Sequence, residues 1–272
     1  MSISVVIPAF NAEKYIKQTL DSVIKQTLQP SEIIVINDGS TDETQDILLQ
    51  NVNNYLLKIY PQQNSGIGVT RQKGALLAKS DYVAFLSSDD CWLPTFLEES
   101  SKFLSPSTAT FTDYWRCDRR LKPFSLYTAP YTLNMNTSII DFALKRNMFI
   151  NFSSIVLPTK IFSQISFEPS LKRGEDLIFL LDTIININPP LTWKCIHKPL
   201  LYYRIHPSQG THTFLHSQSE WELTWQHLTK RLLLLNIPES TLTANKTLEY
   251  NKLFKKSKTK IAKSVARTVL NN

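Results

Sequence analysis

The sequence predicts an α/β protein with a mostly parallel central sheet flanked by helices. Short β-branched runs alternate with segments of 3.6-residue apolar period over the first 105 residues, which is the pattern of strands joined by crossover helices. The connections are short, and polar residues follow each predicted strand at its carboxyl end. With 272 residues, the chain can form one large domain whose core needs no disulfide or metal ion.

The first half contains four predicted strands and the helices between them. The strands occupy residues 4–7, 32–36, 55–60 and 82–86. The helices occupy residues 12–25, 40–50, 66–78 and a segment that begins near Pro94, since proline suits the first helical turn. Ser40 and Glu43 lie three residues apart, which predicts a capping box at the start of the second helix.

The second half is less regular and predicts a mixed arrangement of strands and helices. Strands are expected at residues 109–114, 153–157 and 192–197, with a polar loop between 117 and 135. Helices are expected at residues 138–147, just after Pro158, at 175–186, and as a closing pair at 217–236 and 246–270.

Cysteine usage and hydropathy predict a cytoplasmic protein. The three cysteines, Cys91, Cys117 and Cys195, are an odd number without a CxxC spacing, which favours a reducing compartment. The first residues lack the basic start of a signal peptide, and no apolar run approaches the roughly 20 residues that a bilayer requires. We expect a protein that is soluble or lies on the inner face of a membrane.

The net charge of +7 comes entirely from the end of the chain. Residues 246–272 carry eight basic side chains and one acid, whereas residues 1–245 carry 22 of each sign. Two interpretations of this tail remain open: an amphipathic helix on anionic lipid, or a helix whose apolar stripe packs on the domain or on another subunit. The neutral body gives no reason to expect nucleic-acid binding.

The residues that follow the four predicted strands of the first half are unusually polar. Because ligands of a parallel sheet bind at the carboxyl ends of its strands, these segments should line one binding edge. They are Pro8-Ala9-Phe10-Asn11, Asn37-Asp38-Gly39-Ser40, Asn64-Ser65-Gly66 and Ser87-Ser88-Asp89-Asp90.

The adjacent carboxylates Asp89 and Asp90 are the candidate metal ligands. Two like charges directly after a buried strand repel each other unless they share a cation. Oxygen ligands of this kind suit Mg²⁺ or Mn²⁺, which would also bind the diphosphate of a nucleotide. The alternative is a solvated turn.

Two further side chains are candidates for contact with a nucleotide. Asp38 either accepts hydrogen bonds from a base or ribose, or forms an Asx turn that leads into the next helix. Arg71 lies one turn into the helix after Gly66 and either reaches a phosphate or is solvated. Arg71 also occupies the place where a dinucleotide fingerprint needs its third glycine after Gly66 and Gly68, which argues against that fold.

Together these motifs resemble the family 2 glycosyltransferases, whose single nucleotide-sugar-binding domain has the fold called GT-A. The matching segments are residues 4–16, 32–42, 64–79 and 82–90. The resemblance implies that Asp38 binds the base, usually uridine, in a donor pocket that also includes Pro8, Ala9, Phe10, Asn11, Gly66 and Ser88. It implies that Ser88-Asp89-Asp90 is the metal motif, with Asp90 as the expected direct ligand and Asp89 on the ribose or the metal.

The resemblance extends to an acceptor half. Arg173-Gly174-Glu175-Asp176 looks like the family's Glu-Asp motif, with Asp176 as general base; the alternative is two acids that complement a helix dipole. Residues 199–207 look like the segment near the donor diphosphate, so Arg204 and His206 are candidate phosphate contacts, and His206 is also a candidate metal ligand. We therefore divide the chain into residues 1–105 (donor half), 106–210 (acceptor half) and 211–272 (helical extension with the basic tail).

The resulting hypothesis is an inverting glycosyltransferase that depends on Mn²⁺ or Mg²⁺. It would move one hexosyl or N-acetylhexosaminyl unit from a nucleotide-sugar, expected to be a UDP-sugar, to a glycan or lipid-linked acceptor in glycan, lipopolysaccharide or capsule biosynthesis. The chain lacks the Gln-x-x-Arg-Trp motif and membrane spans of processive members. The alternatives are a nucleotidyltransferase that acts on a sugar phosphate and a catalytically silent nucleotide-sugar-binding protein.

Overall fold

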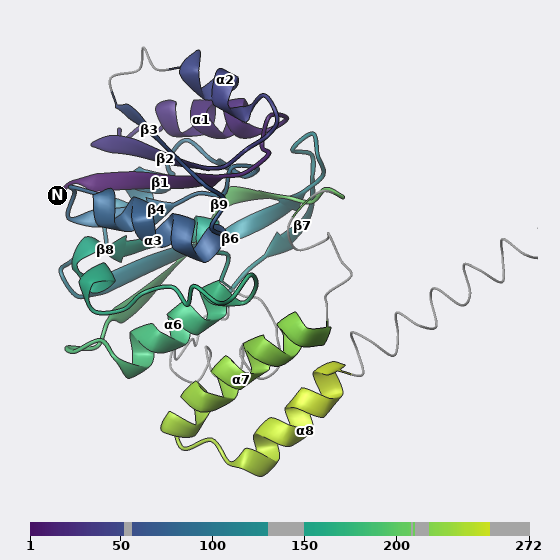
Figure 1. Cartoon of the computed structure of the whole chain (residues 1–272). Coiled ribbons are helices and arrows are strands. Elements are labelled where there is room, and N and C mark those ends of the chain that lie inside the picture. Colours follow the sequence, from purple (N-terminus) through teal and green to yellow (C-terminus); the bar gives the residue numbers. More distant parts are fainter. Residues whose placement is uncertain (52–55, 130–149, 208, 210–217, 251–272) are drawn as a thin grey trace, which may run out of the picture.

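A computed structural model describes residues 1–51, 56–129, 150–207, 209 and 218–250. It is a nine-stranded mixed sheet with the strand order β3-β2-β1-β4-β8-β6-β9-β5, to which β7 adds beside β6. Helices cover both faces of this sheet (Figure 1). The predicted fold class is confirmed. Among the described residues, no helix combines the length and the apolar character that crossing a bilayer requires.

Four parallel strands build the first half of the sheet. They are β1 (Ile3–Ala9), β2 (Glu32–Asp38), β3 (Leu57–Gln62) and β4 (Tyr82–Phe85). Every residue of β1, β2 and β4 is buried, because helices α1 (Ile16–Ile24) and α2 (Thr44–Leu49) cover one face and α3 (Ile67–Leu77) covers the other. The polar ends of these strands therefore share one edge.

The second half of the sheet mixes strand directions. Strand β8 (Ile155–Pro158) runs antiparallel to both β4 and β6 (Thr108–Cys117), so β6 points the same way as β4. The long strand β9 (Thr192–Arg204) lies parallel to β6. The ends of β6 and β9 therefore reach the same edge as the ends of β1 and β4. Two short additions complete the sheet: β5 (Cys91–Trp92) and β7 (Pro123–Tyr127).

Two apolar clusters lie on opposite faces of the sheet. One gathers side chains of β1, β2, α1 and α4 (Phe96–Ser101). The other joins α3, the 3₁₀ helices η1 (Phe152–Ser154) and η2 (Thr159–Ser163), α6 (Glu175–Ile185), α7 (Gln218–Leu234) and α8 (Glu239–Tyr250). Trp225 and Leu232 of α7 are buried in this second cluster, so α7 and α8 continue the core beyond α6, as Figure 1 shows. The division at residue 210 stays a prediction.

The predicted capping box is wrong. Helix α2 begins at Thr44, and its N-cap Glu43 makes no side-chain capping bond. Ser40 Oγ instead accepts the backbone N–H of Asn11, which follows a neighbouring strand (3.0 Å). A contact between two loops that are distant in sequence thus replaces the local bond.

Other element boundaries also differ from prediction. Helix α1 begins at Ile16 rather than at residue 12. Strand β7 occupies part of the predicted polar loop, and β9 continues to Arg204 rather than stopping at residue 197. Cross-strand pairing with β6 explains both extensions, because it supplies backbone partners that local propensity does not reveal. The predicted helix 138–147 and the tail beyond residue 250 lie outside the described residues.

Candidate functional site

Asp38, the last residue of β2, holds the loop that leads into α3. It is 4 % exposed, and its Oδ1 accepts the backbone N–H of Ser65 (2.9 Å) and a side-chain N–H of Gln62 (2.6 Å). Its Oδ2 accepts the backbone N–H of Gly66 (3.0 Å), a residue with a φ of 88°. Because a carboxylate binds this loop, Asp38 sets the position of the first turn of α3.

The end of β1 is joined to the end of β2 in a similar way. Asn11 has a φ of 48°, and its side-chain oxygen accepts the backbone N–H of Thr41 (2.8 Å). Pro8 and Ala9 are buried in the sheet, whereas the ring of Phe10 is half exposed beside them. Phe10 is thus an apolar surface at the edge where Asp38 lies.

Asp90 is sealed inside the protein. It is 1 % exposed, its Oδ1 accepts the backbone N–H of Arg204 (3.0 Å), and its Oδ2 accepts the hydroxyl of Ser153 (2.7 Å). Burial, together with the charge of Asp89, raises the pKa of Asp90 well above its ordinary value. A group in this position joins β4, β9 and η1 and is poorly placed to bind a metal ion from solvent.

Asp89 and His206 form a hydrogen-bonded pair at the same edge, in which His206 is buried and Asp89 is partly exposed. Nε2 of His206 lies 3.0 Å from Oδ2 of Asp89, whose side chain is 21 % exposed. The His206 ring packs on Tyr15, with the ring centroids 4.6 Å apart. The contact between His206 and Asp89 is a direct hydrogen bond or ion pair, and its length also equals the separation of about 3 Å between neighbouring ligands of an octahedral ion at about 2.1 Å. Asp89 is thus the more exposed of the two acids, and the expected metal ligation by Asp90 stays a prediction.

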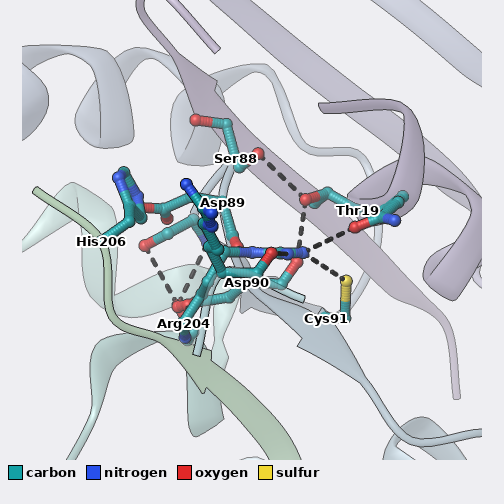
Figure 2. A network of polar contacts seen from close by, with 11 residues as sticks. Thr19, Ser88, Asp89, Asp90, Cys91, Arg204 and His206 are labelled. Atoms are coloured by element: carbon teal, nitrogen blue, oxygen red, sulfur yellow. Dashed lines mark hydrogen bonds and ion pairs between the residues drawn. The ribbon is translucent and has the colours of Figure 1, made fainter. Parts of the chain in front are cut away.

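Arg204 lies under this pair and connects three parts of the edge (Figure 2). It is fully buried. Its Nε donates to the backbone oxygen of Asp89 (2.6 Å), its Nη1 to the backbone oxygen of Arg119 (2.6 Å) and its Nη2 to Gln18 (2.9 Å). The guanidinium also lies over the Tyr15 ring, 4.4 Å from its centroid. These contacts position Asp89 and Arg119, and the expected contact of Arg204 with phosphate stays a prediction.

The acceptor motif begins α6 and is held by α3. Gly174 has a φ of 69° and its backbone turns the chain into the helix. Glu175 is buried and its Oε1 lies 2.8 Å from Nη1 of Arg71. Burial raises the pKa of Glu175 to about 7, and the charge of Asp176 adds to the rise while Arg71 opposes it. Asp176 is only partly buried, beside this ion pair.

Arg71 belongs to the protein interior rather than to solvent. It is 5 % exposed, and its guanidinium lies 4.7 Å from the ring centroid of Phe152. Its Nε is buried without a hydrogen-bond partner in the described part of the chain. The residue after Phe152 is Ser153, which donates to Asp90.

The predicted site residues are therefore connected through protein contacts along one edge. Asp38 holds the first turn of α3, and Arg71 of α3 holds Glu175 beside Asp176. Arg71 also packs on η1, which bonds to Asp90 beside Asp89.

Sequence reasoning missed the residues that support these acids. Thr19 donates its hydroxyl to the backbone oxygens of Ser88 (2.9 Å) and Asp90 (2.8 Å), which ties α1 to the predicted metal motif. Ser153 bonds both Asp90 and Ser87. Neither residue stands in a recognisable motif, because each acts only on partners that are far away in sequence.

Comparison with known proteins identifies the class. Residues 4–164 match the family model described as "Glycosyl transferase family 2". The chain belongs to this family, and it is a glycosyltransferase with a GT-A fold.

Two relatives are similar in sequence over a large part of the chain. It is 29 % identical over 239 residues to an "Uncharacterized glycosyltransferase RP339" of Rickettsia prowazekii (strain Madrid E), which covers 85 % of this chain and 72 % of that protein. It is 33 % identical over 180 residues to the "Putative teichuronic acid biosynthesis glycosyltransferase TuaG" of Bacillus subtilis (strain 168), which covers 64 % of this chain and 69 % of that one.

Solved structures show the same fold. S. aureus TarS 1-349 in complex with UDP matches with a TM-score of 0.66 and 23 % identity over 94 % of this chain and 72 % of TarS. Glucosyl-3-phosphoglycerate synthase from Mycobacterium tuberculosis, in complex with Mn²⁺, UDP and glucosyl-3-phosphoglycerate, matches with a TM-score of 0.56 and 17 % identity over 88 % of this chain and 81 % of that one.

Proposed function

We propose that the protein moves one sugar from a UDP-sugar to an acceptor hydroxyl, with inversion at the anomeric carbon and with Mn²⁺ or Mg²⁺ held by Asp89 and His206. The observation that carries the proposal is the Asp89–His206 pair, whose ligand atoms lie 3.0 Å apart at the edge of the sheet. Support comes from TarS, solved with UDP and with UDP-GlcNAc, and from the synthase solved with Mn²⁺ and UDP. These resemblances favour uridine and an N-acetylhexosaminyl or hexosyl donor.

The chemistry needs one proton acceptor and one stabilised leaving group. A metal ion at Asp89 and His206 would offset the charge of the departing diphosphate. Asp176 takes the proton of the acceptor hydroxyl as its oxygen forms the bond to the anomeric carbon. The bond from that carbon to the diphosphate oxygen breaks on the opposite face, and UDP leaves with the electron pair. No covalent enzyme intermediate is required.

Supporting residues fix the two ends of this displacement. Glu175, paired with Arg71, sets the start of α6 and thereby the position of Asp176. Asp90 and Arg204 hold the backbone that carries Asp89. In the proposed mechanism, such preorganisation would keep the proton acceptor and the leaving group on opposite sides of one reacting carbon.

Replacing the two acids separately tests the assignment. Asp176→Asn should lower sugar transfer by about 10²–10⁴-fold and leave the affinity for UDP with Mn²⁺ unchanged. Asp89→Asn should weaken the metal-dependent part of UDP binding measured by calorimetry, because one ligand is lost. Asp21→Asn, on the partly exposed side of α1, is the matched control.

Either of two results would contradict the roles assigned to Asp176 and Asp89. Full transfer by Asp176→Asn, assayed as UDP release from a panel of UDP-sugars, would remove its role as base. Mn²⁺ dependence of UDP binding that survives in Asp89→Asn but is lost in Asp90→Asn would restore the original order of the two acids.

The acceptor of the enzyme is proposed only as a class of molecule. The similarity to a putative teichuronic acid glycosyltransferase supports an acceptor in the biosynthesis of a cell-envelope polysaccharide.

We keep the hypothesis that residues 246–272 bring the enzyme to anionic lipid at the inner face of the membrane. Pelleting with anionic liposomes, compared between the full chain and one ending at residue 245, tests it, and equal pelleting would contradict it.

A further inference from the structure

A basic cavity opens beside the Asp89–His206 pair. It has a volume of about 580 Å³, and its walls are Lys14, Tyr15, Arg119, Arg120 and Pro207. All of these residues except Tyr15 are exposed, so the three cations meet whatever enters the cavity.

The walls of this cavity are held in place by Arg204. Its guanidinium donates to the backbone oxygen of Arg119 (2.6 Å) and lies over the Tyr15 ring, 4.4 Å from the centroid. The same group donates to the backbone oxygen of Asp89. One buried cation therefore fixes the turn after β6, the start of α1 and the backbone of the proposed metal ligand in a single arrangement.

The cations of the cavity form no close ion pair in the described part of the chain, although backbone N–H groups and then the charge of Arg120 lower the pKa of Asp118. Lys14, Arg119 and Arg120 have no carboxylate partner within 4.0 Å in the part of the chain that the structure describes. Asp118 stands next to them in sequence, but its Oδ1 accepts the backbone N–H groups of Arg120 (2.8 Å) and Lys122 (3.0 Å). Three cations gathered around a cavity repel one another, and an anion between them would relieve that repulsion.

The cavity has walls on both sides of β4, and its two arginines lie on the side away from Asp38. Arg119 follows β6 and Pro207 follows β9, on the far side of β4 from Asp38, whereas Lys14 and Tyr15 follow β1, which lies beside β2. Tyr15 packs on His206 from the side of the cavity. The two arginines, which follow β6, therefore form the part of the cavity that lies farther along the sheet from Asp38 than Asp89 does.

We propose that this cavity binds an anionic group, a carboxylate or a phosphate, on the acceptor glycan. The inference rests on the proposed transfer reaction and adds the chemical class of its acceptor. Arginine recognises both groups through paired N–H donors, and the two arginines come from one turn whose backbone Arg204 anchors.

Titrations with small probes test the proposal. Binding of D-glucuronate and of inorganic phosphate is measured by ligand-observed NMR, with D-glucose as the neutral counterpart and UDP with Mn²⁺ as a separate arm. The variants are the double change Arg119→Ala with Arg120→Ala, and Lys122→Ala, which removes one charge from the same turn outside the cavity. We expect the double variant to lose about tenfold in affinity for the anion that the site prefers, while Lys122→Ala and the UDP arm stay unchanged.

The titrations with different probes distinguish between the possible ligands of the cavity. If glucuronate binds more tightly than phosphate, the acceptor group is a carboxylate. If phosphate binds more tightly, the acceptor group is a phosphate. Equal binding of glucuronate and glucose with no binding of phosphate, or equal losses in both variants, would overturn the proposal. A loss of UDP affinity in the double variant would assign the cavity to the donor and would also overturn it. Failure of the wild type to bind UDP with Mn²⁺ would instead refute the proposed function.

Discussion

Burial and ion pairing oppose each other at Glu175. Its contact with Arg71 favours the carboxylate, but removal from water disfavours the charge more strongly and raises the pKa to about 7. The folded protein therefore holds a proton on Glu175 at pH values where the unfolded chain, with an ordinary value near 4.5, has released it.

This difference predicts a pH-dependent effect of Glu175→Gln. The stabilising contribution of Glu175 is fully present below about pH 4.5 and is lost as pH rises through 7. The free energy of unfolding of the variant should therefore rise relative to that of wild type by roughly 3 kcal/mol across that window. Urea denaturation of both proteins from pH 4.5 to 8 measures it, with Glu43→Gln, at an exposed position, as the control. If the free energies of unfolding of wild type and Glu175→Gln change with pH in the same way, the prediction is contradicted.

The neighbours Asp89 and Asp90 have opposite surroundings. Asp90 is fixed by Arg204 and Ser153, which stand 114 and 63 residues away in sequence. Asp89 lies beside His206, which is 117 residues away. No local pattern distinguishes the two acids, because partners brought by the sheet decide which carboxylate faces outward.

At the scale of elements, α3 lies unusually close to β1. A Cβ added at Gly74 would come within 2.3 Å of Cγ1 of Val6, so only a glycine lets the helix approach the strand this closely. This packing sets the height of α3 above the sheet and therefore the position of Arg71 near its start.

Gly74→Ala should accordingly destabilise the fold by about 2 kcal/mol or more, because the new methyl group overpacks a buried contact. Chemical denaturation measures the loss, with Leu76→Ala on the exposed side of the same helix as the control. Adding Val6→Ala should recover part of the loss, since it removes the clashing methyl groups. If the two changes are simply additive, the close approach is not the cause.

At the scale of the whole molecule, the candidate site is assembled from both halves of the chain. Asp38 and Asp89 come from the predicted donor half, whereas Asp176 and His206 come from the predicted acceptor half. Ligands that join these parts should stabilise the folded state.

UDP with Mn²⁺ should therefore raise the melting temperature by roughly 5 °C or more when both are in about hundredfold excess over their dissociation constants. A chelator should reverse the metal-dependent part, and Asp89→Asn should lack it. Differential scanning fluorimetry with UDP alone, Mn²⁺ alone and both together separates the contributions. A shift by the pair no larger than the sum of the separate shifts would argue against a shared donor and metal site.

The fold was largely predictable because its elements are encoded locally. Strands β1, β2 and β4 are short apolar runs, α3 and α6 begin next to glycine, and the parallel order places their polar ends on one edge. The predictions that failed have a common cause. The capping box around Ser40, the length of β9 and the part played by β7 all depend on pairing with chain segments that are distant in sequence.

The sequence by itself determined the family, the α/β fold and the acidic segments at the edge of the sheet, since these follow from periodicity and from motifs of contiguous residues. Tertiary structure alone decided that Asp89 faces outward, that Arg204 is buried as a support, and that Glu175 pairs with Arg71. The physical reason is that solvent exposure and charge pairing belong to the packed molecule: each of these side chains takes its environment from residues that folding, not chain order, brings beside it.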